Sequence, residues 1–201
     1  MKKVLKFIVF GFIALAVLGA LLGGNENEKD AKGVTQQPNV ESTSTQESKV
    51  EAKNKHLVAS GMYKIGTDLP AGEYMLIADS MAYYEVTKDS SGTLESIIIN
   101  DNFFINRYIT VKEGDYIKLQ SCKLYELEKV PDLDQKEMYK VGVDLEPGEY
   151  KVAAEGQGYL EVSNNSRGGL DSIISNDNFE GEKYITVKDG QYLKLMSAAL
   201  K

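Results

Sequence analysis

The stretch GMYKIGTDLPAGEY, residues 61–74, returns 76 positions later as EMYKVGVDLEPGEY, residues 137–150. Two more pairs match at the same shift: LESIIINDNF (94–103) with LDSIISNDNF (170–179), and YITVKEGDYIKL (108–119) with YITVKDGQYLKL (184–195). An ungapped match over this length indicates a duplicated structural unit. The duplication predicts a first β repeat at residues 59–128, a charged linker at 129–136 and a second β repeat at 137–201.

Both repeats have the composition of β structure. Tyr, Ile, Val and Thr cluster in short runs separated by Gly, Pro, Asn and Asp, which is typical of strands and turns. In the first repeat these runs lie at residues 61–64, 73–78, 83–87, 95–99, 107–111 and 116–127, although 94–99 also fits one helical turn. The predicted fold class is mainly β, with two homologous small antiparallel β-sandwich or jelly-roll-like repeats. One pseudo-symmetric sandwich, with half from each repeat, is the alternative.

Residues 108–119 predict a hairpin, because apolar and polar residues alternate on both sides of a central turn. A three-residue loop at 112–114, with Gly114 in the left-handed conformation, keeps the apolar and polar faces separate. This register pairs Ile109 with Ile117 in the core and, on the outer face, Thr110 with Tyr116 and Tyr108 with Lys118.

Tyrosines recur on the outer face of the predicted strands. Tyr83 and Glu85 alternate with Tyr84 and Val86, and the second repeat has the same pattern. Tyr beside Lys and Glu suits stacking on sugar rings or contact with a peptide, although Tyr also suits any half-exposed strand. The candidate ligand-binding residues are Tyr83, Glu85, Tyr108, Tyr116, Lys118, Tyr159, Glu161, Tyr184, Tyr192 and Lys194.

Two Asn-Asp-Asn triplets offer clustered oxygen atoms. Such atoms suit calcium, with Asp68 or Glu73 as a further donor. The spacing is not that of an EF-hand, however, and Asn and Asp also form turns through their own side chains. Both interpretations stay open, and no other cofactor is expected. The candidate calcium ligands are Asn100, Asp101, Asn102, Asn176, Asp177 and Asn178.

The N-terminal part predicts a membrane anchor followed by a polar tether. Lys2, Lys3 and Lys6 precede an uncharged run at residues 7–24, which is about 27 Å long as a helix. Lysines on this side favour a cytoplasmic N-terminus. We therefore expect residues 1–24 to cross the membrane once and place the repeats outside the cell; cleavage of a signal, with secretion, is the alternative. Residues 25–58 lack apolar surface for a core and predict a disordered linker.

Composition excludes several functional classes. The 201 residues carry a formal net charge of -7, which argues against nucleic-acid binding because that requires a basic surface. The single cysteine, Cys122, permits no internal disulfide, and with the single histidine, His56, it makes no zinc site. Cys122 stands where the second repeat has Ala198, so we expect a small buried slot. Catalytic motifs are absent from the sequence, and we expect neither catalytic residues nor enzymatic activity.

The start YKxGxDLxxGEY and the end YITVKxGxYxKL of each repeat resemble tandem β repeats of uncharacterised exported or membrane-anchored proteins of Gram-positive bacteria. The resemblance covers nearly the whole chain and implies location and architecture, but no activity. Together these features predict a non-catalytic binding or interaction protein at the cell envelope, with a cell-wall polymer or an envelope protein as partner. The alternative is a structural or signalling ectodomain that acts with a membrane protein.

Overall fold

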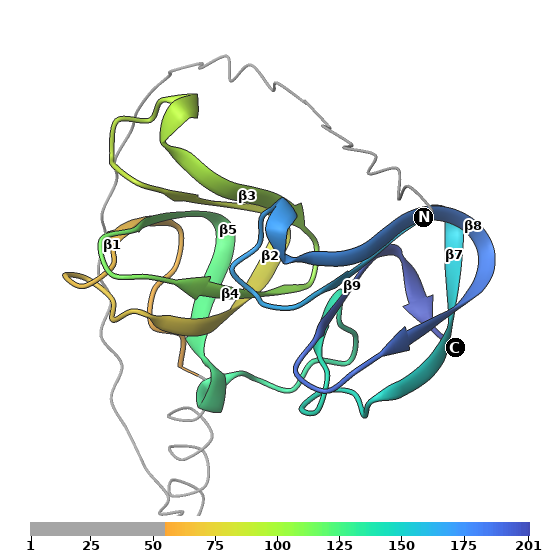
Figure 1. The fold of residues 1–201 in the computed structure, drawn as a ribbon. Helices are drawn as coiled ribbons and strands as arrows, with labels where there is room; N and C mark the ends of the chain where they lie inside the picture. Colours follow the sequence, from red (N-terminus) through yellow and green to blue (C-terminus); the bar gives the residue numbers. More distant parts are fainter. Residues whose placement is uncertain (1–54) are drawn as a thin grey trace, which may run out of the picture. The chain divides into compact units, whose positions relative to one another are not determined.

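The computed structural model describes residues 55–201, which fold mainly as β structure in two antiparallel sheets (Figure 1). This confirms the predicted β class. The described residues belong to one compact unit. Within the described residues, no helix has the length and apolar character needed to cross a membrane. The predicted transmembrane helix at 1–24 and most of the predicted linker at 25–58 lie outside the described residues.

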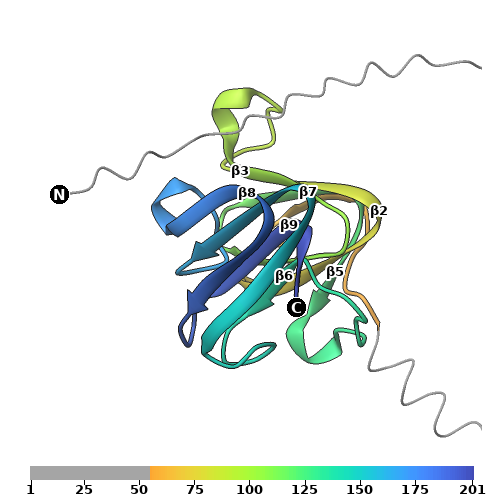
Figure 2. The same ribbon diagram turned by 90° about the vertical axis from the view of Figure 1, so that its right-hand side faces the viewer.

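The first sheet is built around one long strand, β2 (Gly72–Thr87). On one edge β2 pairs with β5 (Tyr116–Glu126), and on the other with two shorter strands, β3 (Ile97–Phe103) and β4 (Asn106–Val111). The short strand β1 (Gly61–Lys64) pairs with the far edge of β5. A single 3-10 turn, η1 (Leu94–Ser96), precedes β3 and projects from the strands in Figure 2. Residues 94–99 therefore divide between the helical turn and the strand that the sequence predicts there.

The second sheet repeats this order with β6 (Met138–Lys140), β9 (Tyr192–Leu200), β7 (Gly148–Ser163) and β8 (Ile173–Val187). Here β8 is one continuous strand in the place of β3 and β4. The turn η2 (Leu127–Lys129) follows the first sheet, and η3 (Leu170–Ser172) precedes β8. The equal strand order follows from the duplicated sequence, since both repeats carry the same turn and alternation signals.

Each central strand bends where several of its residues face a single residue of the neighbouring strand. The pairing of β2 with β5 breaks between Ala78 and Tyr83, which leaves Ser121 alone opposite the bulge. Ser121 has φ 55°, and Ser197 in the second repeat has φ 50°; few residues other than glycine adopt this left-handed conformation. Because a bulge redirects a strand, side chains from both halves of β2 reach one apolar cluster.

The predicted hairpin at residues 108–119 is wrong, because β4 and β5 lie on opposite edges of β2. Ile109 pairs with Tyr74 and Ile117 with Val86, both on β2. Gly114 does have φ 86°, but the loop at 112–114 connects two edges of the sheet instead of closing a hairpin. Ile109 and Ile117 are both fully buried, as predicted. Alternation determines the face that a side chain takes, but not the strand that lies beside it.

The outer-face pairs predicted with that hairpin are also wrong. Thr110 lies opposite Glu73, and Tyr108 lies opposite Met75, both on β2. Tyr116 and Lys118 lie on β5, where they pair with β1 and with the second half of β2. The residues of β4 thus share a face with the first half of β2, and this face contacts the second repeat.

Three apolar clusters hold the described residues together. One lies inside each repeat, and the third lies between them. Cys122 is fully buried in the first cluster, as Ala198 at the equivalent position predicts. The third cluster contains Met75, Tyr108, Tyr125, Met138 and Tyr192, drawn from both repeats. This shared cluster positions the candidate site.

Candidate functional site between the two repeats

A largely polar interface joins the repeats around the third cluster. The rings of Tyr108 and Tyr192 meet edge to face, with centroids 5.7 Å apart. We call the contributing surface of the first repeat the docking face: Glu73, Asn106, Arg107, Tyr108, Thr110 and Asp115. We call the surface of the second repeat that contacts it the receiving face: Glu137, Met138, Lys140, Asp144, Ser166, Arg167 and Tyr192.

Arg107 is the buried cation of the docking face. Its side chain is 1% exposed, and Nε donates to Asp101 at 2.9 Å while Nη1 donates to Glu137 at 3.1 Å. The same Glu137 oxygen accepts two backbone N–H groups between β3 and β4, at 2.8 and 3.0 Å. Burial opposes ionisation of Asp101, but Lys194 and Arg107 hold the pKa of that carboxyl below its ordinary value. Every charge in this buried group therefore has an opposite charge beside it.

The side-chain amide of Asn106 joins the two repeats by hydrogen bonds to backbone groups, as a neighbouring strand would. Its side chain is fully buried. Oδ1 accepts the backbone N–H groups of Glu137 and Met138 at 2.8 and 3.3 Å, and Nδ2 donates to the carbonyl of Met138 at 2.8 Å. The amide thus satisfies three backbone groups at the start of β6, which would otherwise be buried without partners.

The carboxylate of Glu73 binds three residues of the receiving face. It accepts hydrogen bonds from Lys140 at 2.5 Å, from Ser166 at 2.6 Å and from Tyr192. Ser166 also lies 2.7 Å from the Thr110 hydroxyl. Burial alone would raise the pKa of Glu73, but these three donors hold it below its ordinary value. The carboxylate is therefore ionised and holds the two repeats together.

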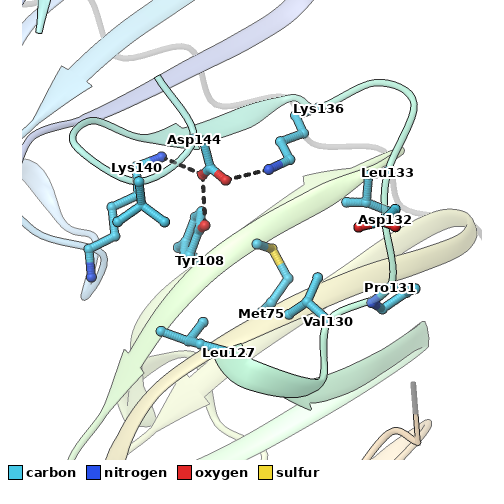
Figure 3. A pocket seen from close by; sticks show the side chains of 11 residues that line it. Met75, Tyr108, Leu127, Val130, Pro131, Asp132, Leu133, Lys136, Lys140 and Asp144 are labelled. Atoms are coloured by element: carbon cyan, nitrogen blue, oxygen red, sulfur yellow. Dashed lines mark hydrogen bonds and ion pairs between the residues drawn. The ribbon is translucent and has the colours of Figure 1, made fainter. Parts of the chain in front are cut away.

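A cavity of about 350 Å³ opens beside these contacts (Figure 3). The first repeat, the linker and the second repeat all contribute to its walls. It is lined by Met75, Tyr108, Leu127, Val130, Pro131, Asp132, Leu133, Lys136, Lys140, Val143 and Asp144. This volume and this mixture of apolar side chains with a few polar groups are typical of sites for small ligands.

The polar wall of the cavity is organised by Asp144. Figure 3 shows its carboxylate between Tyr108 and Lys136. It accepts the Tyr108 hydroxyl at 2.7 Å and the backbone N–H of Lys140 at 2.8 Å, and it pairs with the Lys136 ammonium. Burial, and then the Asp144 carboxylate, raise the pKa of Tyr108. The phenol therefore remains a protonated donor at the border between the polar and apolar walls.

Six of the predicted ligand-binding residues, with two asparagines, form two matching clusters on the outer faces of the sheets. In the first repeat, Tyr83 donates to Glu85 at 2.6 Å, Asn100 donates to Tyr83 at 3.2 Å, and Lys118 lies 3.4 Å from Glu85. Burial, and then the hydrogen bond to Glu85, raise the pKa of Tyr83 to about 12. The outer-face alternation in the sequence thus identified side chains that contact one another.

The second repeat reproduces this geometry. Tyr159 donates to Glu161 at 2.6 Å, Asn176 donates to Tyr159 at 3.3 Å, and Lys194 lies 3.4 Å from Glu161. Lys194 also lies 3.4 Å from Asp101 of the first repeat. The second cluster therefore borders the interface between the repeats.

The other predicted tyrosines differ in their exposure to solvent. Tyr108 and Tyr192 are only 4% and 6% exposed, because the interface covers them. Tyr116 is half-buried beneath the ammonium of Lys64, which lies 5.6 Å from its ring centre. Tyr184 is 62% exposed. The expectation that Tyr108 and Tyr192 are available on an outer face is therefore wrong, and a role in ligand binding stays a prediction for the other members.

The Asn-Asp-Asn triplets lie inside strands β3 and β8, not in turns. The carboxylates of the triplets already pair with Arg and Lys side chains. Asp101 lies beside Arg107 and Lys194, and Asp177 pairs with Lys183 at 2.5 Å. Among residues 55–201, no three acidic, His or Cys side chains gather in a way that would hold a metal ion. Calcium binding by these residues stays a prediction.

Sequence reasoning missed the charged residues of the interface. Arg107, Asp115, Glu137 and Arg167 carry its main ion pairs, and Arg167 pairs with Asp115. A signal was available, because the equivalent residues of the other repeat are Lys183, Gln191, Gly61 and Ser91. Three of these four positions differ in charge between the repeats, and such differences mark surfaces that the two copies use differently.

No family model, no curated protein and no solved structure matches this chain.

Proposed function

We propose that this protein is a non-catalytic binding protein of the cell envelope. Residues 1–24 anchor it in the membrane with a cytoplasmic N-terminus, and the polar linker holds two homologous sandwich-like β repeats outside the cell. The lysines before the uncharged run and the polar composition of residues 25–58 support this location. The resemblance to exported Gram-positive proteins agrees with it.

The observation that best supports a binding role is the cavity at the junction of the repeats. It combines an apolar wall with a polar wall. Along the border between them, Asp144 orients the Lys136 ammonium, a potential donor, and the Tyr108 hydroxyl oxygen, a potential acceptor. Its walls carry both signs of charge, through Lys136, Lys140 and Asp144. Such a site suits an amphiphilic peptide-like segment, in which small apolar groups alternate with amides and terminal charges. The peptide portion of a cell-wall polymer has this chemistry.

Co-sedimentation of the purified chain with peptidoglycan tests the proposal. Val143 lines the cavity and is 71% exposed, so Val143→Trp fills the opening without disturbing a core. Thr67 occupies the equivalent turn of the first repeat and does not line the cavity, so Thr67→Trp is the matched control. We expect saturable pelleting by the wild type and by Thr67→Trp, and a loss of affinity of about tenfold or more for Val143→Trp.

Each outcome assigns the function differently. Equal pelleting by both tryptophan variants would remove the cavity from the proposal and leave the outer-face cluster of Tyr83 and Glu85 as the surface to test. Absence of pelleting by the wild type would contradict a cell-wall ligand and favour the ectodomain alternative, with a membrane protein as partner. Crosslinking in intact cells would then identify that partner. Loss of pelleting with a chelator would assign calcium to the binding reaction.

A further inference from the structure

The docking face of the first repeat has an uncovered equivalent on the second repeat. Shifted by 76 positions, Tyr108 becomes Tyr184, Thr110 becomes Thr186 and Glu73 becomes Glu149, so all three side chains are retained. Tyr108 is 4% exposed in the interface, whereas Tyr184 is 62% exposed. Thr186 and Glu149 are exposed as well. The second repeat therefore presents the central residues of a docking face that no described residue covers.

The receiving face also has an uncovered equivalent, on the first repeat. Met138, which is 6% exposed in the interface, corresponds to Met62, which is 40% exposed. The other retained residues at equivalent positions are Lys64, Asp68, Ser90 and Tyr116, matching Lys140, Asp144, Ser166 and Tyr192. Of these four, Tyr116 is half-buried and the rest are exposed. Each end of the described region thus keeps one uncovered half of the interface.

The uncovered receiving face is already in the conformation of the occupied one. The backbone N–H of Lys64 donates to Asp68 at 2.8 Å, as that of Lys140 does to Asp144. Lys64 lies 5.6 Å from the centre of the Tyr116 ring, and the equivalent pair in the interface has the same separation. Little rearrangement would be needed for a docking face to bind there.

The retained residues would recreate several contacts between two chains. By equivalence with the interface, the expected contacts are Glu149 with Lys64, Glu149 with Tyr116, Tyr184 with Asp68, Thr186 with Ser90, and Asp177 with Lys118. Opposite charges meet in the first and last of these pairs. None of the five brings like charges together.

The changed residues would make this contact weaker than the one inside the chain. The pair Arg107 and Glu137 becomes Lys183 and Gly61, and the pair Arg167 and Asp115 becomes Ser91 and Gln191. The change to Ser91 and Gln191 removes both charges of that pair. Lys183, which has no acidic partner at Gly61, already pairs with Asp177. Three uncharged residues of the interface also become charged: Met75, Asn106 and Tyr125 become Lys151, Glu182 and Lys201. Lys151 pairs with Glu182, and burial of these side chains costs free energy, which weakens the contact further.

We propose that the uncovered docking face of the second repeat binds the uncovered receiving face of the first repeat in a second copy of this chain. The contact is heterologous, since the two surfaces differ, and it repeats the arrangement that joins the two repeats internally. Such a contact leaves one unpaired face at each end of a dimer and therefore permits further addition. Its weaker form makes the association reversible.

Paired cysteines test this geometry in the full-length chain. The hydroxyl oxygens of Thr110 and Ser166 lie 2.7 Å apart, so T110C with S166C forms a disulfide within one chain. The equivalent pair is T186C with S90C, which would join two chains. Cys122→Ala supplies the background, because alanine stands at the equivalent position. We expect oxidation to give monomers for T110C/S166C, and a ladder of dimers and larger species for T186C/S90C.

The single variants sharpen the experiment. Differently tagged S90C and T186C chains should form the mixed dimer on oxidation, and each alone should remain monomeric. Monomeric T186C/S90C under conditions that fully oxidise T110C/S166C would overturn the proposal. So would failure of a thiol-reactive polymer to label S90C or T186C in the monomer, because residues 1–54 would then cover the face.

A charge exchange provides a test that needs no disulfide. Lys64 and Glu149 are exposed, so their substitution should leave folding intact. We expect K64E and E149K each to reduce self-association, measured by energy transfer between labelled chains, by about tenfold or more. Mixing K64E with E149K should restore association, because the two substituted side chains then bring opposite charges together at one junction. Unchanged association of both single variants would overturn the proposal.

Discussion

Arg107 and Lys183 occupy equivalent positions in the two repeats but opposite environments. Arg107 is 1% exposed and bridges Asp101 to Glu137 across the interface. The Lys183 side chain is 29% exposed, and among residues 55–201 its ion pair is with Asp177, whose side chain is 52% exposed. One ancestral position has thus become a buried junction in one repeat and a surface ion pair in the other.

This difference predicts unequal costs for the same substitution. Arg107→Met removes the cation beside Glu137 and one of the two cations beside Asp101, so we expect a loss of about 3–5 kcal/mol in the free energy of unfolding. Lys183→Met removes an exposed ion pair and should cost about 1 kcal/mol or less. Denaturant titration of both variants measures the difference. Similar losses for the two would show that Arg107 does not hold the interface.

Glu73 should be sensitive to loss of charge, whereas Glu149 should not. Glu73→Gln keeps the size of the side chain but weakens its bonds to Lys140, Ser166 and Tyr192, and we expect a loss of about 2 kcal/mol in stability. Glu149 is exposed, so Glu149→Gln should change stability by about 0.5 kcal/mol or less. Thermal unfolding of the two variants checks this prediction. A stable Glu73→Gln variant would contradict the role of this carboxylate.

Acid should weaken the junction between the repeats. Hydrogen bonds and cations hold the pKa values of Glu73 and Asp101 below their ordinary values against the effect of burial, and Arg167 does the same for Asp115. The unfolded chain then binds more protons than the folded one. Stability is therefore full above the unfolded pKa values and falls as the pH drops below about 5. Urea midpoints between pH 7 and pH 3 measure the slope, which should be smaller for Glu73→Gln.

The thiol of Cys122 should be inert in the folded protein. It is fully buried, and burial raises its pKa to about 11, so both access and thiolate formation are suppressed. We expect a thiol reagent to label the native chain only at its rate of opening, and the denatured chain at once. Rapid labelling without denaturant would show that the first apolar cluster opens locally.

Local sequence signals predicted much of the β structure. The strand positions and the burial of Ile109 and Ile117 follow from alternation within short segments. The contacts of Tyr83 with Glu85 follow in the same way, since residues two apart on a strand share a face. Each of these features depends on neighbours along the chain.

Features that depend on distant pairing were not accessible in this way. Nothing near residues 108–119 indicates that β2 lies between β4 and β5. The interface joins Glu73 to Tyr192 and Asp115 to Arg167, whose positions follow only from the packing of the finished sheets. The same packing places Asp101 inside a strand beside two cations, where its sequence alone suggested a turn or a calcium loop.

The cavity beside Asp144 exists only while the two repeats remain docked, because its walls come from β2, β4, the linker and the second repeat. By thermodynamic linkage, any molecule that binds there stabilises the docked form. At a hundred times its dissociation constant, such a molecule adds about 2.7 kcal/mol to that form. Occupancy of the cavity would thus determine how rarely the two repeats separate.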